Sequence, residues 1–283
     1  MAIKQSFMVK TGMDVDTLSL KANPGESLLV KEIGVDNLGN VEFAKVSIDR
    51  VTLAYLSAYD DKQNQFYFAR EAAAFPNLMA YLYDKGIFKG FPVKEGQELT
   101  VDISGASSKN ARVMYEIHEA GDMTDEMQNA TGAKEYMFWN YGTNSAEIEA
   151  NGNGIFDKCL TPAEFPDFPF GDIVPAKTQI EIIGLLIGTH RKGVYFGDKL
   201  RYLKFSKGRE VLFDEDRTGF YCAHGMNYFP FHAQFYERPC VLFPEPLVFG
   251  PGDELVLNMS VGPDALPADG GLICLVERVT KIE

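Results

Sequence analysis

One aromatic segment occurs twice in the chain, and this repeat constrains the fold more than any other feature. Phe66-Tyr67-Phe68-Ala69 is followed by Phe75-Pro76, and Phe220-Tyr221-Cys222-Ala223 is followed by Phe229-Pro230. Phe, Tyr, Ala, Phe and Pro match at five positions with a constant separation of 154 residues. A repeat of this length is of domain size rather than solenoid size. The chain is therefore expected to contain two domains of related fold.

Further matches extend the repeat on both sides of the aromatic segment. Each is a run of alternating apolar and polar residues beside a Gly- or Pro-containing turn, which is typical of a half-buried strand. The paired segments are 24–34 with 175–184, 93–104 with 249–260, and 112–117 with 272–277. The alignment places Gly34 against Gly184 and Gly96 against Gly252.

Short strands, turns at regular spacing and little helical periodicity predict an all-β protein. Each repeat has room for about eight strands, and eight strands in two sheets make a jelly roll. We expect an N-terminal arm over 1–15, a first jelly-roll domain over 16–119, a connector over 120–171 and a second jelly-roll domain over 172–283.

Four local expectations follow from the patterns. Residues 77–83 fit a helical turn or a strand equally well, and 125–136 fit a short helix inside the connector. The last two strands of each domain are expected to pair with each other. The prolines of Pro239–Phe249 favour an edge strand or an irregular crossing.

Composition excludes several classes of function. The net charge is −13, and no run of Lys or Arg stands out, which argues against a nucleic-acid surface. The N-terminal residues do not form a signal peptide, and no stretch is apolar enough to span a membrane. The four cysteines are Cys159, Cys222, Cys240 and Cys274. Two of these align with apolar residues of the other repeat, which predicts free thiols and a reducing compartment.

No catalytic or metal motif supports an enzyme, and no cofactor is expected. The four histidines are His118, His190, His224 and His232, and no two are one residue apart as a metal-binding cupin would require. His224 and His232 with Glu237 remain a weak metal hypothesis, and paired carboxylates of a glycosidase cannot be recognised in one sequence. Residues 149–160 partly match a calcium-binding loop. Its first position holds Glu149 rather than Asp, and its last holds Leu160 where a bidentate Glu is needed, so plain turns are expected.

At the level of architecture, over about 16–119 and 172–281, the chain resembles the double jelly-roll major capsid proteins of membrane-containing, tailless icosahedral viruses, bacteriophages among them. The resemblance implies a structural protein of the virion, assembled in the host cytoplasm. It implies a homotrimer with six-fold outer shape, whose strands stand roughly perpendicular to the shell. The expected partners are neighbouring capsomers, other capsid proteins and an internal lipid membrane surface, with no direct contact to nucleic acid.

A tandem carbohydrate-binding or adhesin module is the alternative, and Tyr67, Tyr221 and Tyr228 are its candidate sugar platforms. The single tryptophan, Trp139, and the lack of a secretion signal weigh against it. The repeated aromatic residues are expected to be structural anchors that cap each barrel, or else to pack between subunits. They are Phe66, Tyr67, Phe75, Pro76, Phe220, Tyr221, Phe229 and Pro230.

Overall fold

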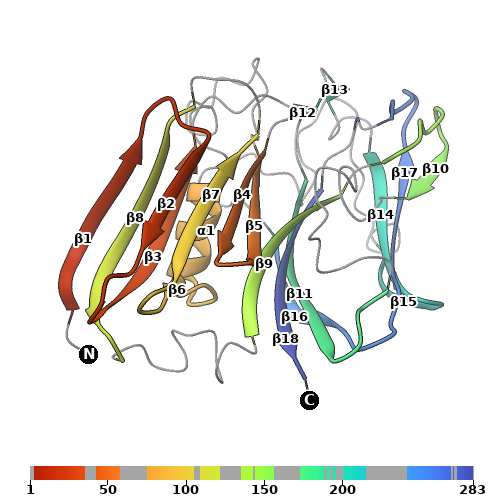
Figure 1. Cartoon of the computed structure of the whole chain (residues 1–283). Coiled ribbons are helices and arrows are strands. Elements are labelled where there is room, and N and C mark those ends of the chain that lie inside the picture. The colour runs from red at the N-terminus through yellow and green to blue at the C-terminus, as the bar shows by residue number, and fades with distance from the viewer. Residues whose placement is uncertain are drawn as a thin grey trace. The chain divides into compact units, whose positions relative to one another are not determined.

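In the computed structural model, the described residues form mainly antiparallel strands, with one helix among them (Figure 1). It divides into two compact units, Met1–Phe138 and Trp139–Glu283. The all-β class expected from the sequence is confirmed. The structure describes residues 3–35, 43–57, 75–104, 109–121, 135–142, 144–155, 173–187, 190–191, 194–195, 200–214, 241–268, 270 and 273–282.

Eight described strands form two sheets in the first unit. Their bounds are β1 (Ile3–Gly12), β2 (Thr17–Lys21), β3 (Glu26–Val35), β4 (Phe43–Ile48), β5 (Val51–Ser57), β6 (Phe91–Val93), β7 (Glu98–Ile103) and β8 (Ala111–Glu119). One sheet has the order β1-β8-β3-β6, and the other contains the run β5-β4-β7-β2.

The pairing of these strands defines a jelly roll. The first strand pairs with the eighth, the second with the seventh, the third with the sixth and the fourth with the fifth, all antiparallel. This is the pattern made when one long eight-stranded hairpin is wound into two sheets. The remaining pairs, β3 with β8 and β4 with β7, complete the sheets.

The second unit repeats this strand order. Its strands are β9 (Glu135–Gly142), β10 (Asn153–Ile155), β11 (Thr178–Ile187), β14 (Leu200–Lys207), β15 (Glu210–Asp214), β16 (Val241–Phe249), β17 (Leu255–Val261) and β18 (Ile273–Lys281). The unit boundary falls within β9, and β9 neighbours β18. β10 pairs with β17, β11 with β16, and β14 with β15. A two-stranded hairpin, β12 (His190–Arg191) and β13 (Val194–Tyr195), is inserted between the third and fourth strands.

A β-bulge lies at the same place in both units. On the third strand of the first unit the register with β8 shifts between Val30 and Glu32. On the third strand of the second unit the register with β18 shifts between Ile182 and Gly184, which are 152 residues further on. A bulge adds one residue to one strand and increases its local twist. The two units therefore share a local distortion as well as a strand order.

The turn before the seventh strand is also common to both units. Gly96 and Gly252 have φ angles of 80° and 81°, a left-handed conformation that glycine adopts without strain. The amide of Gly96 donates to Ala22 O over 3.2 Å, and that of Gly252 donates to Val174 O over 3.0 Å. Gly96 and Gly252 are paired in the sequence alignment, and the structure gives them the same role.

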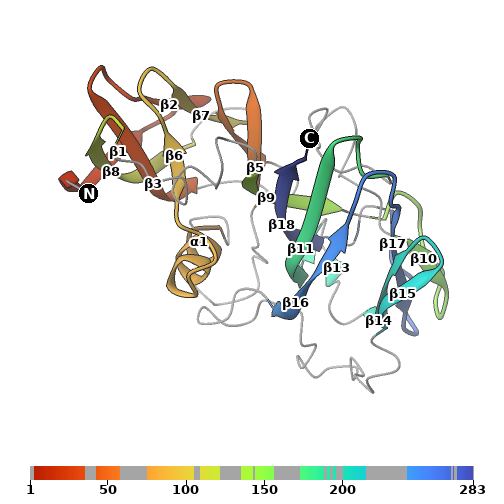
Figure 2. The same cartoon turned by 90° about the horizontal axis from the view of Figure 1, so that it is seen from below.

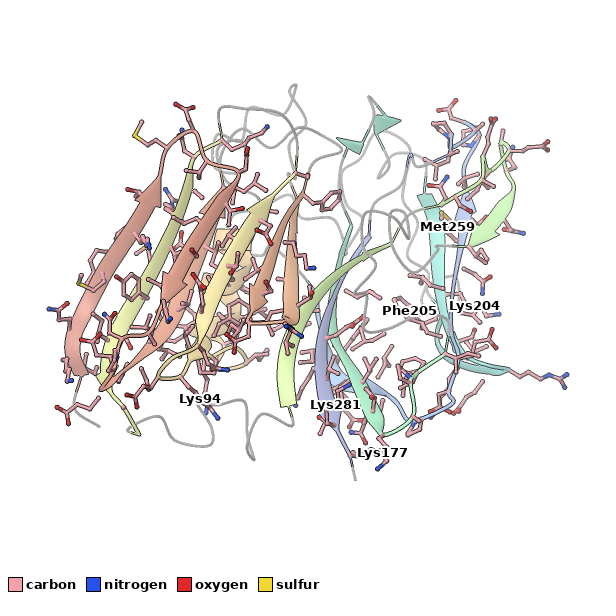
Figure 3. All side chains as sticks on the ribbon, viewed as in Figure 1. Lys94, Lys177, Lys204, Phe205, Met259 and Lys281 are labelled. Carbon is pink, nitrogen blue, oxygen red and sulfur yellow. The ribbon has the colours of Figure 1, made fainter. Side chains whose placement is uncertain are left out.

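The strands form where apolar residues alternate. In β7, Leu99, Val101 and Ile103 are buried, and the residues between them are partly or fully exposed, as the two-residue period of a strand requires. Phe205 of β14 is fully buried, and its ring lies edge-on to Phe243 of β16, with centroids 6.0 Å apart. Phe205 thus points from β14 into the space between the two sheets, and Lys204 points away (Figure 3).

The helix α1 (Phe75–Asp84) covers part of the first unit. It packs against β3 and lies on the side of β3 and β6 away from β2 and β7 (Figure 2). Met79 and Leu82 of the helix and Phe88 after it are buried, and Phe88 lies edge-on to Phe91 at 4.9 Å. Of the two conformations expected for 77–83, the helix is therefore observed.

Three expectations need correction. Residues 3–12, expected to be part of an arm, form β1, the first strand of the first jelly roll. The expected connector contains β9 and β10, the first two strands of the second jelly roll. The last two strands of each unit do not pair with each other, because a jelly roll places its seventh and eighth strands in different sheets. β7 pairs with β2 and β4, and β17 pairs with β10 and β14.

Candidate interaction surfaces

The repeated aromatic residues lie largely outside the described residues. Phe75 and Pro76 begin α1, but their side chains are not described, and Phe66, Tyr67, Phe220, Tyr221, Phe229 and Pro230 fall outside the described ranges. Their role as structural anchors stays a prediction. The expected helix over 125–136 is contradicted at its end, because Glu135 and Tyr136 belong to β9, and 125–134 fall outside the described ranges. The platform residue Tyr228 and three of the cysteines, Cys159, Cys222 and Cys240, also fall outside.

The candidate metal sites can be followed only in part. Among the described residues, no group of three or more His, Cys, Asp and Glu side chains is placed to hold a metal ion. His190 lies in β12, whereas His224, His232 and Glu237 lie outside the described ranges. In the described part of the calcium-like segment, the amide of Gly152 donates to Glu149 O over 2.9 Å and closes a turn.

A polar cluster joins α1 to the first sheet. Lys31 Nζ lies 3.1 Å from Tyr83 Oη and 3.6 Å from Glu116 Oε2, and it stands 4.3 Å from the centre of the Tyr83 ring. His118, which is buried, lies with its Nε2 3.1 Å from Glu116 Oε2. The ammonium group of Lys31 interacts with the carboxylate of Glu116 on β8 and with the ring of Tyr83 on α1. The cluster is therefore suited to holding the helix against the sheet that contains β3 and β8. Sequence patterns gave no signal for it, because its members come from three separate elements.

Asp253 closes the repeated turn in the second unit. Its Oδ2 accepts a hydrogen bond from the amide of Gly250 over 2.6 Å and lies 2.7 Å from Lys207 Nζ. The hydrogen bond from Lys207 lowers the pKa of Asp253 below its usual range, and the bond from Gly250 lowers that pKa further. In the first unit Gln97 stands at this place, and its Oε1 accepts from the amide of Lys94 over 3.0 Å. Both side chains thus accept a hydrogen bond that closes the turn, and in the second unit the accepting group is charged.

β1 exposes an unusual amount of apolar surface, which the sequence analysis missed. Ile3, Phe7 and Val9 on the strand are 48%, 72% and 46% exposed, and Met13 just after it is 77% exposed. Eight of the ten residues of β1 are exposed and two are partly buried. β1 lies at the end of its sheet (Figure 1). Its neighbour β8 carries Tyr115, whose pKa is raised by burial and by the charge of Glu26.

A second surface, on the second unit, is acidic. Residues 144–155 and 262–268 contain Glu147, Glu149 and Asp264 and no Lys or Arg. Glu147 and Glu149 flank the buried Ile148, which bonds to Leu266 in both directions at 2.8 and 2.9 Å. Because side chains alternate along an extended segment, both carboxylates project away from the buried side. Ile155 of β10, 54% exposed, belongs to the same segment.

The segments of this acidic surface are held together by hydrogen bonds. Asn144 is buried and donates from Nδ2 to Pro267 O over 2.7 Å and to Ala146 O over 3.0 Å. The amide of Asn151 donates to Gly262 O over 2.7 Å, and that of Val261 donates to Gly152 O over 3.0 Å. The three carboxylates therefore stand on a bonded framework.

Comparison with known proteins finds no matching family model and no matching curated protein. Among solved structures, the chain is similar to the major capsid protein of bacteriophage PM2, with 8% identity, a TM-score of 0.42 and 98% of each chain covered. It is also similar to VP54 of PBCV-1, a structure fitted into a reconstruction of the virophage Sputnik, with 8% identity, a TM-score of 0.35 and 99% and 96% covered.

A third similar structure contains tandem family 51 carbohydrate-binding modules of a family 98 glycoside hydrolase from Streptococcus pneumoniae. Its identity is 8%, its TM-score 0.24, and 95% of this chain and 83% of that chain are covered. The jelly-roll assignment rests on the strand pairs of the chain itself. No helix in the described part of the chain has the length and apolar character to cross a membrane.

Proposed function

We propose that the chain is a major capsid protein, a structural subunit of an icosahedral viral shell that acts as a trimeric capsomer. The observation that carries the proposal is the occurrence of two jelly rolls with one strand order in a single chain. Jelly rolls are common in viral capsids. The inference from this topology to a role in a viral shell is an analogy between folds. It can be tested because it predicts a particular oligomer, the trimer.

The duplication has a geometric consequence for assembly. Three copies of a chain with two similar units, arranged about a three-fold axis, present six similar units around that axis. Such a capsomer has an approximately hexagonal outline and fills a hexagonal array. The common bulge and turn of the two units support this reading, because units that play similar parts around one axis need similar shapes.

The charge of the chain suits a shell that does not touch the genome. A net charge of −13 disfavours direct binding of nucleic acid. The partners in this proposal are two further copies within the capsomer, neighbouring capsomers, other capsid proteins and the surface of an internal membrane. The virion is the corresponding location.

Light scattering coupled to size-exclusion chromatography tests the proposal. The expected species contains three chains of 31.5 kDa each, and it keeps this stoichiometry over a range of protein concentrations. A species of two or four chains, or a monomer at every concentration, contradicts the trimeric capsomer. A monomer that binds glycans on an array instead supports the tandem carbohydrate-binding module.

A further inference from the structure

The other ends of the described sheets are less open to pairing than β1. β6 and β10 have three residues each, and β15 and β2 have five. β16 has nine residues, but it contains Pro244 and Pro246, which cannot donate to a neighbouring strand. β1 has ten residues and no proline. A long apolar edge of this kind attracts another chain unless it is covered.

The charge of β1 indicates what covers it. Residues 3–13 contain Lys4 and Lys10 and no acidic residue, in a chain whose net charge is −13. Lys4 is used within the unit, since its Nζ donates to Gly25 O over 3.0 Å and lies 4.0 Å from Glu119. Lys10 is exposed beside Val9. A partner surface complementary to β1 is therefore both apolar and acidic.

The second unit of the same chain offers such a surface. Glu147, Glu149 and Asp264 supply the negative charge, and Ile155 supplies exposed apolar area. A second copy of an acidic chain is repelled at most orientations, because both copies carry a net charge of −13. Approach of Lys10 of β1 to these carboxylates is an orientation in which the local charges attract.

We propose that β1 of one copy docks on the acidic surface of a second copy, formed by residues 144–155 and 262–268. The contact is heterologous, because the two surfaces belong to different units. Each copy therefore offers one surface of each kind, and when the rotation between successive copies closes, a ring forms in which every surface is occupied. The inference deepens the proposed capsid function by naming the surfaces of self-association, and it does not depend on the number of copies.

Charge reversal tests the contact. Lys10→Glu places a carboxylate against the acidic surface and weakens association, whereas Lys10→Glu combined with Glu147→Lys and Glu149→Lys restores it. Phe7→Ser removes the one aromatic side chain of β1 and weakens association about tenfold or more, as expected for a central interface residue. The matched controls are Lys21→Glu and Val51→Ser, at exposed positions that belong to neither surface. Circular dichroism checks that each variant is folded.

The dissociation constant is measured by analytical ultracentrifugation at low and high NaCl. Support requires weaker association of Lys10→Glu and Phe7→Ser, recovery in the combined variant, unchanged controls and weaker wild-type association at high salt. If the wild-type chain associates and the β1 variants associate equally well, the docking surface is wrong and the capsomer proposal stands. If the β1 variants dissociate a species that is not a trimer, the docking surface stands and the trimer is wrong. A wild-type chain that stays monomeric at every concentration overturns the docking.

Discussion

Replacing Asp253 separates the charge of this residue from its hydrogen bond. In Asp253→Asn the amide oxygen still accepts from the amide of Gly250, as the Gln97 oxygen accepts from Lys94 in the first unit. The attraction to Lys207 Nζ, 2.7 Å away, is lost. In Asp253→Ala both interactions are lost. Asp253→Ala is therefore expected to destabilise the protein more than Asp253→Asn.

The magnitudes follow from exposure. The side chains of Lys207 and Asp253 are 31% and 29% exposed, so their ion pair contributes about 0.2–1 kcal/mol. The hydrogen bond to Gly250 contributes about 0.5–1.5 kcal/mol. We expect Asp253→Asn to lower the free energy of unfolding by about 0.2–1 kcal/mol at pH 7. Asp253→Ala is expected to lower it by about 0.7–2.5 kcal/mol.

The dependence on pH has a definite sign. The pKa of Asp253 is lowered in the folded protein, chiefly by the hydrogen bond from Lys207. The folded state therefore favours the ionised carboxylate, and the stabilisation is complete above the pKa of the unfolded chain, about 3.9. It is lost as the pH falls through the lower pKa of the folded protein. The difference between wild type and Asp253→Asn should shrink below about pH 4, whereas the difference between the Asn and Ala variants should persist.

Urea denaturation at pH 7 and at pH 3 measures these differences. The fluorescence of Trp139, the only tryptophan, reports on the unit that contains Asp253. Asp264→Asn, at an exposed carboxylate of the same unit, is the control. Equal losses in the Asn and Ala variants at pH 7 would refute the role of the turn hydrogen bond. A difference between wild type and Asp253→Asn that is unchanged at pH 3 would refute the role of the charge.

Three further predictions concern backbone strain and core packing. Lys177 has a φ of 58° where Gly25 of the first unit has 76°. Lys177→Gly should therefore raise the free energy of unfolding by about 0.5 kcal/mol, because relief of about 1–2 kcal/mol exceeds the entropy cost of about 0.4–1 kcal/mol; a lower urea midpoint would contradict this. Phe205→Ala should lower the free energy of unfolding by about 3–5 kcal/mol, since the side chain is fully buried; a loss under 1 kcal/mol would contradict the position of Phe205 in the core. Phe75→Ala and Phe229→Ala should each cost about 3–5 kcal/mol if these anchors are buried, and unchanged denaturation midpoints in both would exclude the anchor role.

Strand positions could be predicted because alternation is a local signal. The alternating segments 24–34, 93–104 and 112–117 coincide largely with β3, β7 and β8. Partners could not be predicted, because alternation says which residues face the core and nothing about which strands lie side by side. The last two strands of each domain look like hairpins in the sequence, but the winding of the jelly roll sends them to different sheets.

The alignment of the repeats is two residues out of register in two places. The structure sets Gly184 against Glu32 rather than Gly34, because both follow the common bulge. It sets Arg112 of β8 at the position of Cys274 of β18 rather than Leu272. A shift of two residues returns every side chain to the same face of its strand. Sequence alternation therefore cannot detect such a shift.

The first strand of the first jelly roll was missed for a physical reason. None of the residues of β1 is fully buried. Because the strand has no buried face, its sequence does not need alternating apolar and polar residues, and the usual sequence signal of a strand is weak. The same exposure makes β1 a candidate for contact with another chain. A strand that is hard to recognise in the sequence can thus show, by its exposed apolar side chains, where another chain binds.

Electron microscopy of the purified assembly tests the central claim most directly. The account predicts particles with three-fold symmetry whose averaged images show six similar lobes, two from each chain. Particles with two-fold symmetry, or three-fold particles whose two lobes per chain differ plainly in size and shape, would contradict the claim that two equivalent jelly rolls build a pseudo-hexagonal capsomer.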